Sequence, residues 1–253
     1  MKTYLILLAV LFVGVFLFSG LQNKETQKGF FYDYLPVSHS DCEVVKHTYY
    51  SLCYSKKHEQ ASWVYYLLSD SMIVGSSERK NYFPKDVFVT TGTSSYGDYT
   101  NSGFDRGHLL PAADMKWNQF AMNETFLMSN VAPQNRGFNQ YGLWKKLETH
   151  VRKWVVERKH LHVFVGGVLT ENLEKMSNTN ISVPKYFYKI LFDEANFTSI
   201  AFLLKNSNDS KNLTDFVVPI DSVELITNID FFSVLTEKKE SILERSVELE
   251  GWF

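Results

Sequence analysis

The stretch Ser102–Met115, SGFDRGHLLPAADM, places an arginine, a histidine and two aspartates around a glycine and then becomes apolar. Two interpretations of this cluster are open: a surface turn that carries polar side chains, or one half of an active site. Within this cluster, Gly107 lets the backbone turn closely, so that the side chains of Arg106 and His108 can contact the same substrate. The chemistry of these residues and the sequence that follows them decide between the two interpretations.

Hydrolysis of a phosphodiester would use both side chains. The substrate is an anion that resists attack, so the reaction needs a base, cationic charge on the non-bridging oxygens and a group that stabilises the leaving oxygen. His108 suits the role of base near neutral pH, and the forked guanidinium of Arg106 suits phosphate. The tetrapeptide DRGH is a weak signal by itself, because a histidine near a turn is more often a surface residue.

Oxygen donors follow along residues 124–148, ETFLMSNVAPQNRGFNQYGLWKKLE. Asn130, Gln134, Asn139 and Glu148 offer the ligands of a hard cation such as magnesium, which keeps several waters and accepts few protein ligands. No set of cysteines and histidines competes for a softer metal. The pattern therefore predicts magnesium, with manganese or another hard divalent cation as the alternative.

The N-terminal residues differ in composition from the rest of the chain. Residues 4–18 are unbroken apolar and residues 4–21 approach a spanning length of about 18 to 20 residues. We expect 1–21 to be a signal peptide or an uncleaved membrane anchor, 22–40 to be a linker, and 41–253 to be one folded domain. This organisation predicts an exported protein that is secreted, periplasmic or held at a membrane through residues 4–21.

The composition and the two cysteines limit the class of protein to which this chain can belong. The apolar and charged fractions, 45% and 21%, exclude a disordered chain. Cys42 and Cys53 lie eleven positions apart; export would permit a disulfide between them, and a domain of this length does not require one. The sequence leaves that bond open.

Hydrophobic patterning predicts a mixed fold. Residues 143–158 carry apolar side chains at helical spacing, and six other segments have the β-branched and aromatic composition of strands. Because strands and helices do not alternate regularly, we expect an α+β fold with a mainly antiparallel sheet flanked by helices. The predicted strands are 44–55, 61–69, 87–92, 161–169, 186–193 and 197–204.

Charge is distributed unevenly along the chain. Residues 105–162 hold nine Lys or Arg against five Asp or Glu, a net charge of +4, whereas the whole chain has a net charge of −2. A basic patch can concentrate a polyanion even on an acidic protein. The competing interpretation is a solvated helix face with ordinary lysines and arginines.

Three ordered motifs, DRGHLLPAADM, TFLMSNVAPQNRGFN and LWKKLE, closely resemble the DNA/RNA non-specific endonuclease family, the endonuclease G-like ββα-metal nucleases. The likeness extends from about residue 40 to the end of the chain, through segments such as VFVGGVL, VPKYFYKILFD and VELITNIDFF. The resemblance implies a ββα-metal nuclease fold, in which a hairpin leads into a helix laid against an antiparallel sheet. It also implies a nuclease domain at 41–253 that cuts DNA and RNA without sequence preference.

The resemblance implies a role for each motif residue. His108 is expected to be the general base, Arg106 to contact the phosphate and Asn139 to be the one direct protein ligand of magnesium. Glu148 is expected to hold metal-bound water, and Arg152 to contact the scissile phosphate. Four further residues are expected to contact the substrate or shape the site: Asp105, Asn130, Gln134 and Arg136.

One departure from the family concerns the metal ligand. The family pattern FN-x-G-x-W places Trp four positions after Asn, whereas FNQYGLW places Trp144 five positions after Asn139. An added residue rotates a regular helix by about 100°. Either the turn around Gly142 absorbs the extra residue, or Gln140 replaces Asn139 at the metal. We expect the first, because glycine permits a bulge before the helix begins.

Three functions remain open at this point. The first is a metal-dependent, sequence-non-specific nuclease. The second is a membrane-tethered nucleic-acid-binding protein that lost catalysis through the added residue. The third is hydrolysis of a small phosphodiester, for which the same base and metal would serve.

Overall fold

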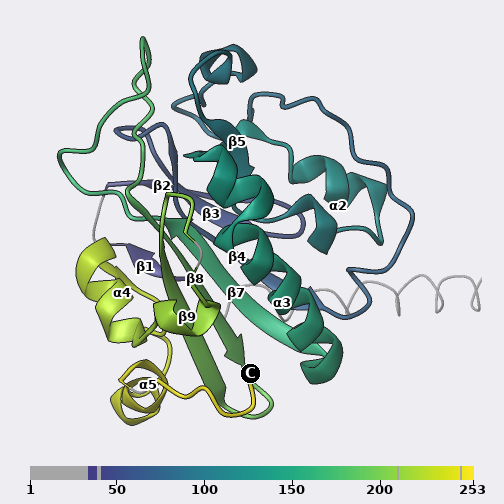
Figure 1. The fold of residues 1–253 in the computed structure, drawn as a ribbon, viewed down its shortest axis with the longest axis vertical. Helices are drawn as coiled ribbons and strands as arrows, with labels where there is room; N and C mark the ends of the chain where they lie inside the picture. Colours follow the sequence, from purple (N-terminus) through teal and green to yellow (C-terminus); the bar gives the residue numbers. More distant parts are fainter. Residues whose placement is uncertain (1–33, 39–40, 210, 246) are drawn as a thin grey trace, which may run out of the picture. The chain divides into compact units, whose positions relative to one another are not determined.

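The computed structural model describes residues 34–38, 41–209, 211–245 and 247–253 (Figure 1). The expected signal or anchor segment 1–21 lies outside the described residues, as does most of the expected linker. Within the described part of the chain, no helix combines the length and the apolar character needed to cross a membrane. Residues Val37–Ser38, which fall in the expected linker, form strand β1 and pair with β11 (Ile229–Asp230).

A seven-stranded, wholly antiparallel sheet lies at the centre, in the order β10-β9-β8-β7-β4-β3-β2. Side chains alternate along each strand, so Val64 and Tyr66 of β4 pack on one face, and Trp63 and Tyr65 on the other. Both faces therefore carry a hydrophobic core. The strands are β2 (Glu43–Lys46), β3 (Ser51–Ser55), β4 (Gln60–Ser69), β7 (His160–Gly167), β8 (Tyr186–Asp193), β9 (Thr198–Lys205) and β10 (Val217–Val218).

Helices cover the sheet. Helix α3 (Leu143–Arg158) lies across β4 and β7, as Figure 1 shows, and its expected bounds of 143–158 are confirmed. The apolar stripe of α3 is buried because it faces the sheet. Helices α4 (Ile220–Thr227) and α5 (Glu237–Glu244) contribute to the core on the opposite face. The expected α+β class is thus confirmed.

The ββα unit follows the order of the motifs. Strands β5 (Asp105–His108) and β6 (Val131–Gln134) pair antiparallel in a small separate sheet. A π-helical turn, η4 (Gly137–Tyr141), then leads from β6 into α3. The unit therefore sets the DRGH strand beside the start of the long helix. Between the two strands lie η2 (Ala112–Asp114), α2 (Gln119–Glu124) and η3 (Met128–Asn130); short turns η1 (Tyr96–Tyr99) and η5 (Leu213–Phe216) lie elsewhere.

Two strand predictions are wrong. Residues 87–92 form turns, because the Asp86 carboxylate accepts a hydrogen bond from the Phe88 backbone N–H at 2.9 Å and Gly92 has a φ of +75°. Residues 44–55 form two strands, β2 and β3, with a turn between them. A disulfide joins Cys42 to Cys53 at this hairpin.

Candidate active site

A cavity of about 340 Å³ opens between the ββα unit and the loop that holds Arg79. It receives side chains from β5, from the turn η4 and from the first two turns of α3. Four of the residues expected from the sequence, Arg106, His108, Asn139 and Glu148, meet there. The lining is Arg79, Arg106, His108, Pro111, Ala112, Ala113, Asn139, Gln140, Tyr141, Lys145 and Glu148.

Strand β5 brings the arginine and the histidine to one face. Residues two apart on a strand point the same way, so Arg106 and His108 both reach the cavity. Between them, Gly107 leaves room for the neighbouring strand, because a Cβ at this position would overlap the side chain of Gln134. Gln134 is itself fully buried, so it packs β6 against β5 without lining the cavity.

His108 is buried, with 8% of its surface exposed. Its ring lies against Phe83 and Phe126, with centroids 5.3 and 4.8 Å away. Atom Nε2 has no hydrogen-bond partner within the described residues. Burial, together with the positive charge of Arg79, lowers the pKa of His108 to about 3. The ring is therefore neutral at neutral pH, which is the form that accepts a proton.

The cavity also holds three cationic side chains. The guanidinium of Arg106 lies 3.6 Å from the centroid of Tyr96 and donates a hydrogen bond of 2.8 Å to the backbone carbonyl of the same residue, so it is fixed in place. Arg79 and Lys145 add two more charges that the sequence did not single out. Lys145 belongs to the quoted motif LWKKLE, but Arg79 lies in a loop without periodicity, where no pattern marks it.

The turn before α3 is where we expect the extra residue to be absorbed. Residues Gly137–Tyr141 form a π-turn, Gly142 is extended with φ −88° and ψ −155°, and α3 begins at Leu143. A Cβ at position 142 would approach the Gly137 carbonyl to 2.7 Å, so the turn requires glycine there. The start of α3 after Gly142 is the arrangement that we expect if this turn absorbs the extra residue. Glu148 consequently keeps its place on the second turn of α3.

Asp105 holds the turn from the side of β5. Its Oδ2 accepts hydrogen bonds from Asn139 Nδ2 at 3.0 Å and from Gln140 Nε2 at 2.7 Å. Because each amide nitrogen is used in this way, each carboxamide oxygen is left for another partner. Both side chains line the cavity, so both candidate ligands are present in it.

Glu148 lines the cavity and is 8% exposed. Burial raises the pKa of its carboxyl, and the positive charge of Lys189 opposes that rise. Lys189 is fully buried on β8, with Nζ 4.7 Å from the Trp144 ring centroid, and burial lowers its pKa. The charge of Lys189 therefore partly offsets the larger effect of burial and favours the ionised form of Glu148.

Three other expected residues lie outside the lining. The Asn130 side chain is fully buried and exchanges hydrogen bonds of 2.9 and 3.0 Å with the backbone of Leu110, so it fixes the chain that follows His108. Arg136 is exposed at the start of η4. Arg152 forms an ion pair of 3.0 Å with the buried carboxylate of Asp114.

The oxygen donors of the cavity fit a hard divalent cation. Asn139 and Gln140 offer carboxamide oxygens, and Glu148 offers a carboxylate. No cysteine lies among the lining residues, and His108 is the single imidazole, so the set does not suit a soft metal.

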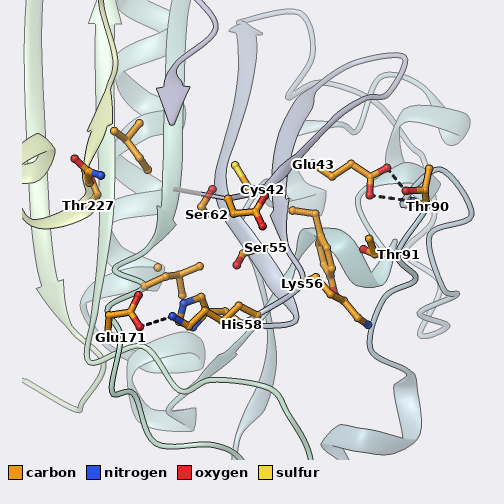
Figure 2. A pocket seen from close by; sticks show the side chains of 17 residues that line it. Cys42, Glu43, Ser55, Lys56, His58, Ser62, Thr90, Thr91, Glu171 and Thr227 are labelled. Atoms are coloured by element: carbon orange, nitrogen blue, oxygen red, sulfur yellow. Dashed lines mark hydrogen bonds and ion pairs between the residues drawn. The ribbon is translucent and has the colours of Figure 1, made fainter. Parts of the chain in front are cut away.

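A larger cavity, of about 630 Å³, shares no lining residue with the first (Figure 2). Several of its charged groups are paired: Lys57 with Glu171 and Lys56 with Glu59. The Glu43 carboxylate accepts a hydrogen bond of 2.9 Å from the backbone N–H of Thr90, as Figure 2 shows. His58 is hydrogen-bonded to Ser182 at 2.7 Å. The described residues that line the larger cavity include no arginine, whereas two arginines, Arg79 and Arg106, line the cavity around His108 together with Lys145, which forms an ion pair of 3.9 Å with Glu148.

Comparison with known proteins agrees with this geometry. The chain is 32% identical over 222 residues to the mitochondrial nuclease of Saccharomyces cerevisiae, covering 77% of this chain and 67% of the relative. It is 31% identical over 199 residues to human endonuclease G, mitochondrial, with 72% and 67% covered. The crystal structure of the EndoG/EndoGI complex matches with a TM-score of 0.72 and 28% identity, covering 79% of this chain and 89% of that one.

These relatives overturn one prediction. The expectation of a secreted, periplasmic or membrane-anchored protein is wrong, because the yeast and human relatives are mitochondrial nucleases by name. Residues 4–21, on which that expectation and the membrane contact rested, lie outside the described residues.

The family model for DNA/RNA non-specific endonucleases matches residues 29–238, most of the chain. The matching structure is that of an EndoG complex, and its likeness confirms the ββα-metal nuclease fold. Membership of this fold implies a divalent metal ion. The chain is therefore a nuclease, a hydrolase that acts on nucleic acids, and it belongs to the DNA/RNA non-specific endonuclease family.

Proposed function

We propose that residues 41–253 form a metal-dependent endonuclease domain that hydrolyses phosphodiester bonds in DNA and RNA without sequence preference. The observation that carries this proposal is the lining of one cavity. A buried, neutral histidine, three cationic side chains and three oxygen-donor side chains line the same 340 Å³ space. This is the set of groups that phosphodiester hydrolysis requires.

In this mechanism His108 is the general base. Because Nε2 is buried without a partner in the described residues, Nδ1 is the nitrogen assigned to the attacking water. The water loses its proton to Nδ1 as its oxygen attacks phosphorus. The bond from phosphorus to the 3′ oxygen breaks, that oxygen takes a proton from solvent water, and Nδ1 returns its proton to solvent. The products are a 5′-phosphate and a 3′-hydroxyl.

The cations hold the substrate. Arg106, Arg79 and Lys145 face the cavity and would bind the non-bridging oxygens of the phosphate. Arg152 would reach the phosphate only by leaving Asp114. Asp105 would act indirectly, through the two carboxamides that it holds.

The proposed cofactor is magnesium, with manganese or another hard divalent cation as a substitute. The Asn139 carboxamide oxygen would be its direct protein ligand, and Glu148 would hold a water of its shell. When bound, such an ion supplies positive charge to the phosphate and to the departing oxygen. Lys189 contributes by favouring the ionised form of Glu148.

The alternative of a binding protein without catalysis rested on the added residue. Helix α3 begins after Gly142, and Asn139 and Glu148 line one cavity, which supports catalysis over the binding protein. Hydrolysis of a small phosphodiester would use the same groups. Competition between a dinucleotide and plasmid DNA separates it from the proposed activity.

Digestion of plasmid DNA by the full chain tests the metal requirement. We expect cleavage with magnesium, none with a chelator, and recovery when magnesium is returned in excess. The 5′ ends of the products should be phosphorylated and should show no common sequence. Cleavage that persists in chelator would contradict the proposed chemistry, and a lack of cleavage with every divalent cation would favour the binding protein.

Binding of duplex DNA by the full chain in chelator should weaken steeply with salt. If three cations of the cavity contact phosphates, counterion release predicts a loss of affinity of roughly 40-fold between about 50 and 200 mM salt. Fluorescence anisotropy at several salt concentrations gives the slope. A flat dependence would mean that the basic segment 105–162 is only a solvated face.

A further inference from the structure

Tyr141 is an exposed aromatic side chain on the wall of the catalytic cavity. It is 73% exposed, more than any other aromatic residue in the described part of the chain. No ring contact or hydrogen bond of its side chain is found within those residues. A free aromatic face at a site with several cations is unusual in a domain whose other large rings are mostly buried.

The backbone that carries Tyr141 is fixed on both sides. Before it, Asn139 and Gln140 are held by Asp105, and Phe138 is fully buried against Phe187 and Trp144. After it, Gly142 packs against the turn and α3 begins. The ring therefore projects from a rigid turn, so little backbone freedom would be lost when a ligand covers it.

The neighbours of Tyr141 identify the ligand. Arg79, Arg106 and Lys145 line the same cavity and suit a phosphate group. A nucleotide whose phosphate lies among these cations has its base one sugar away. An exposed ring at the edge of the phosphate site offers that base a flat apolar surface, and stacking of this kind accepts all four bases.

We propose that Tyr141 is a stacking platform for an unpaired nucleobase beside the scissile phosphate, and that it makes single-stranded nucleic acid the preferred substrate of this enzyme. The proposal rests on the nuclease function proposed above. In a duplex both faces of each base are covered by neighbouring bases, so the platform has nothing to contact unless the base leaves the stack. Tyr141 is the last residue of the turn η4, where we expect the extra residue to be absorbed.

The test compares an intact strand with one that lacks bases. Affinities of the full chain for a short thymidine strand and for an abasic strand of equal length are measured by anisotropy in chelator, so that no cleavage occurs. We expect the wild type to prefer the intact strand and Tyr141→Ala to reduce this preference about tenfold, as loss of one stacked base predicts. Tyr141→Phe should retain the preference, because its ring stacks equally well.

Tyr186→Ala is the matched control. Tyr186 is also an exposed tyrosine, at 41%, but it does not line the cavity, so the preference should be retained. Thermal unfolding of each variant shows whether it is folded. An equal preference in wild type and Tyr141→Ala, or a wild type without preference, would overturn the platform. Failure of the nuclease proposal would appear separately, as absence of magnesium-dependent cleavage by the wild type.

Discussion

Replacing His108 by alanine should lower the rate of magnesium-dependent cleavage at least about a hundredfold, the lower range for loss of a general base. The ring is neutral, buried and set on the cavity by β5, and no second imidazole lines that space to take over the proton. The measurement is the initial rate of plasmid nicking at saturating magnesium. Thermal unfolding must show that the variant is folded.

His58→Ala provides the matched control. His58 is likewise a buried histidine, with its pKa lowered to about 4 by burial and by Lys175, but it lies on the larger cavity and is bonded to Ser182. Its loss should change stability and leave the cleavage rate per folded molecule close to that of the wild type. Activity of His108→Ala within about threefold of the wild type would remove the histidine from the role of base.

The second large effect is expected at the metal ligand. Asn139→Ala should raise the magnesium concentration for half-maximal cleavage at least about tenfold, or abolish cleavage, whereas Gln140→Ala should do much less. Magnesium demands near-octahedral geometry, so the carboxamide must point to the same place as the water held by Glu148. Because α3 begins after Gly142, Asn139 is not part of that helix. Its side chain therefore need not point to the helix face opposite Glu148, as it would if α3 began earlier.

The two variants also distinguish the alternatives. Each loses one hydrogen bond to Asp105, at 3.0 Å for Asn139 and 2.7 Å for Gln140, so a loss of positioning alone would affect them similarly. Titration with magnesium at fixed substrate concentration separates a metal effect from a general loss of rate. The reverse ranking would assign the metal to Gln140. Unchanged magnesium dependence in both would place the metal elsewhere.

Much of the fold could be predicted from the sequence, because helices and strands depend on the periodicity of apolar residues. The bounds of α3 follow from one apolar stripe, and the long strands from β-branched and aromatic runs. The same rule failed at Val87 and Phe88, which are 86% and 62% exposed. There the local hydrogen bond of Asp86 to the backbone determines a turn, and composition does not reveal it.

The residues of the site could be predicted from the sequence only where they lie in recognisable motifs. His108, Asn139 and Glu148 come from segments with recognisable order, and the structure brings them to one cavity. Arg79 comes from a loop whose position depends on tertiary packing. The pairing of Arg152 with Asp114 joins residues 38 positions apart, so the sequence could not show where that guanidinium is held.

The π-turn before α3 also bears on how such chains diverge. A residue gained in α3 between Leu143 and Glu148 would rotate Glu148 by about 100° about the helix axis, away from the cavity. A residue gained at η4 changes the length of a turn, and the helix behind it keeps its register against the sheet. The length of this turn can therefore change without moving Glu148 relative to the sheet. A sequence pattern that fixes the spacing from Asn to Trp would miss chains with this longer turn, whereas one that allows a single gap before Gly142 and none after it would retain them.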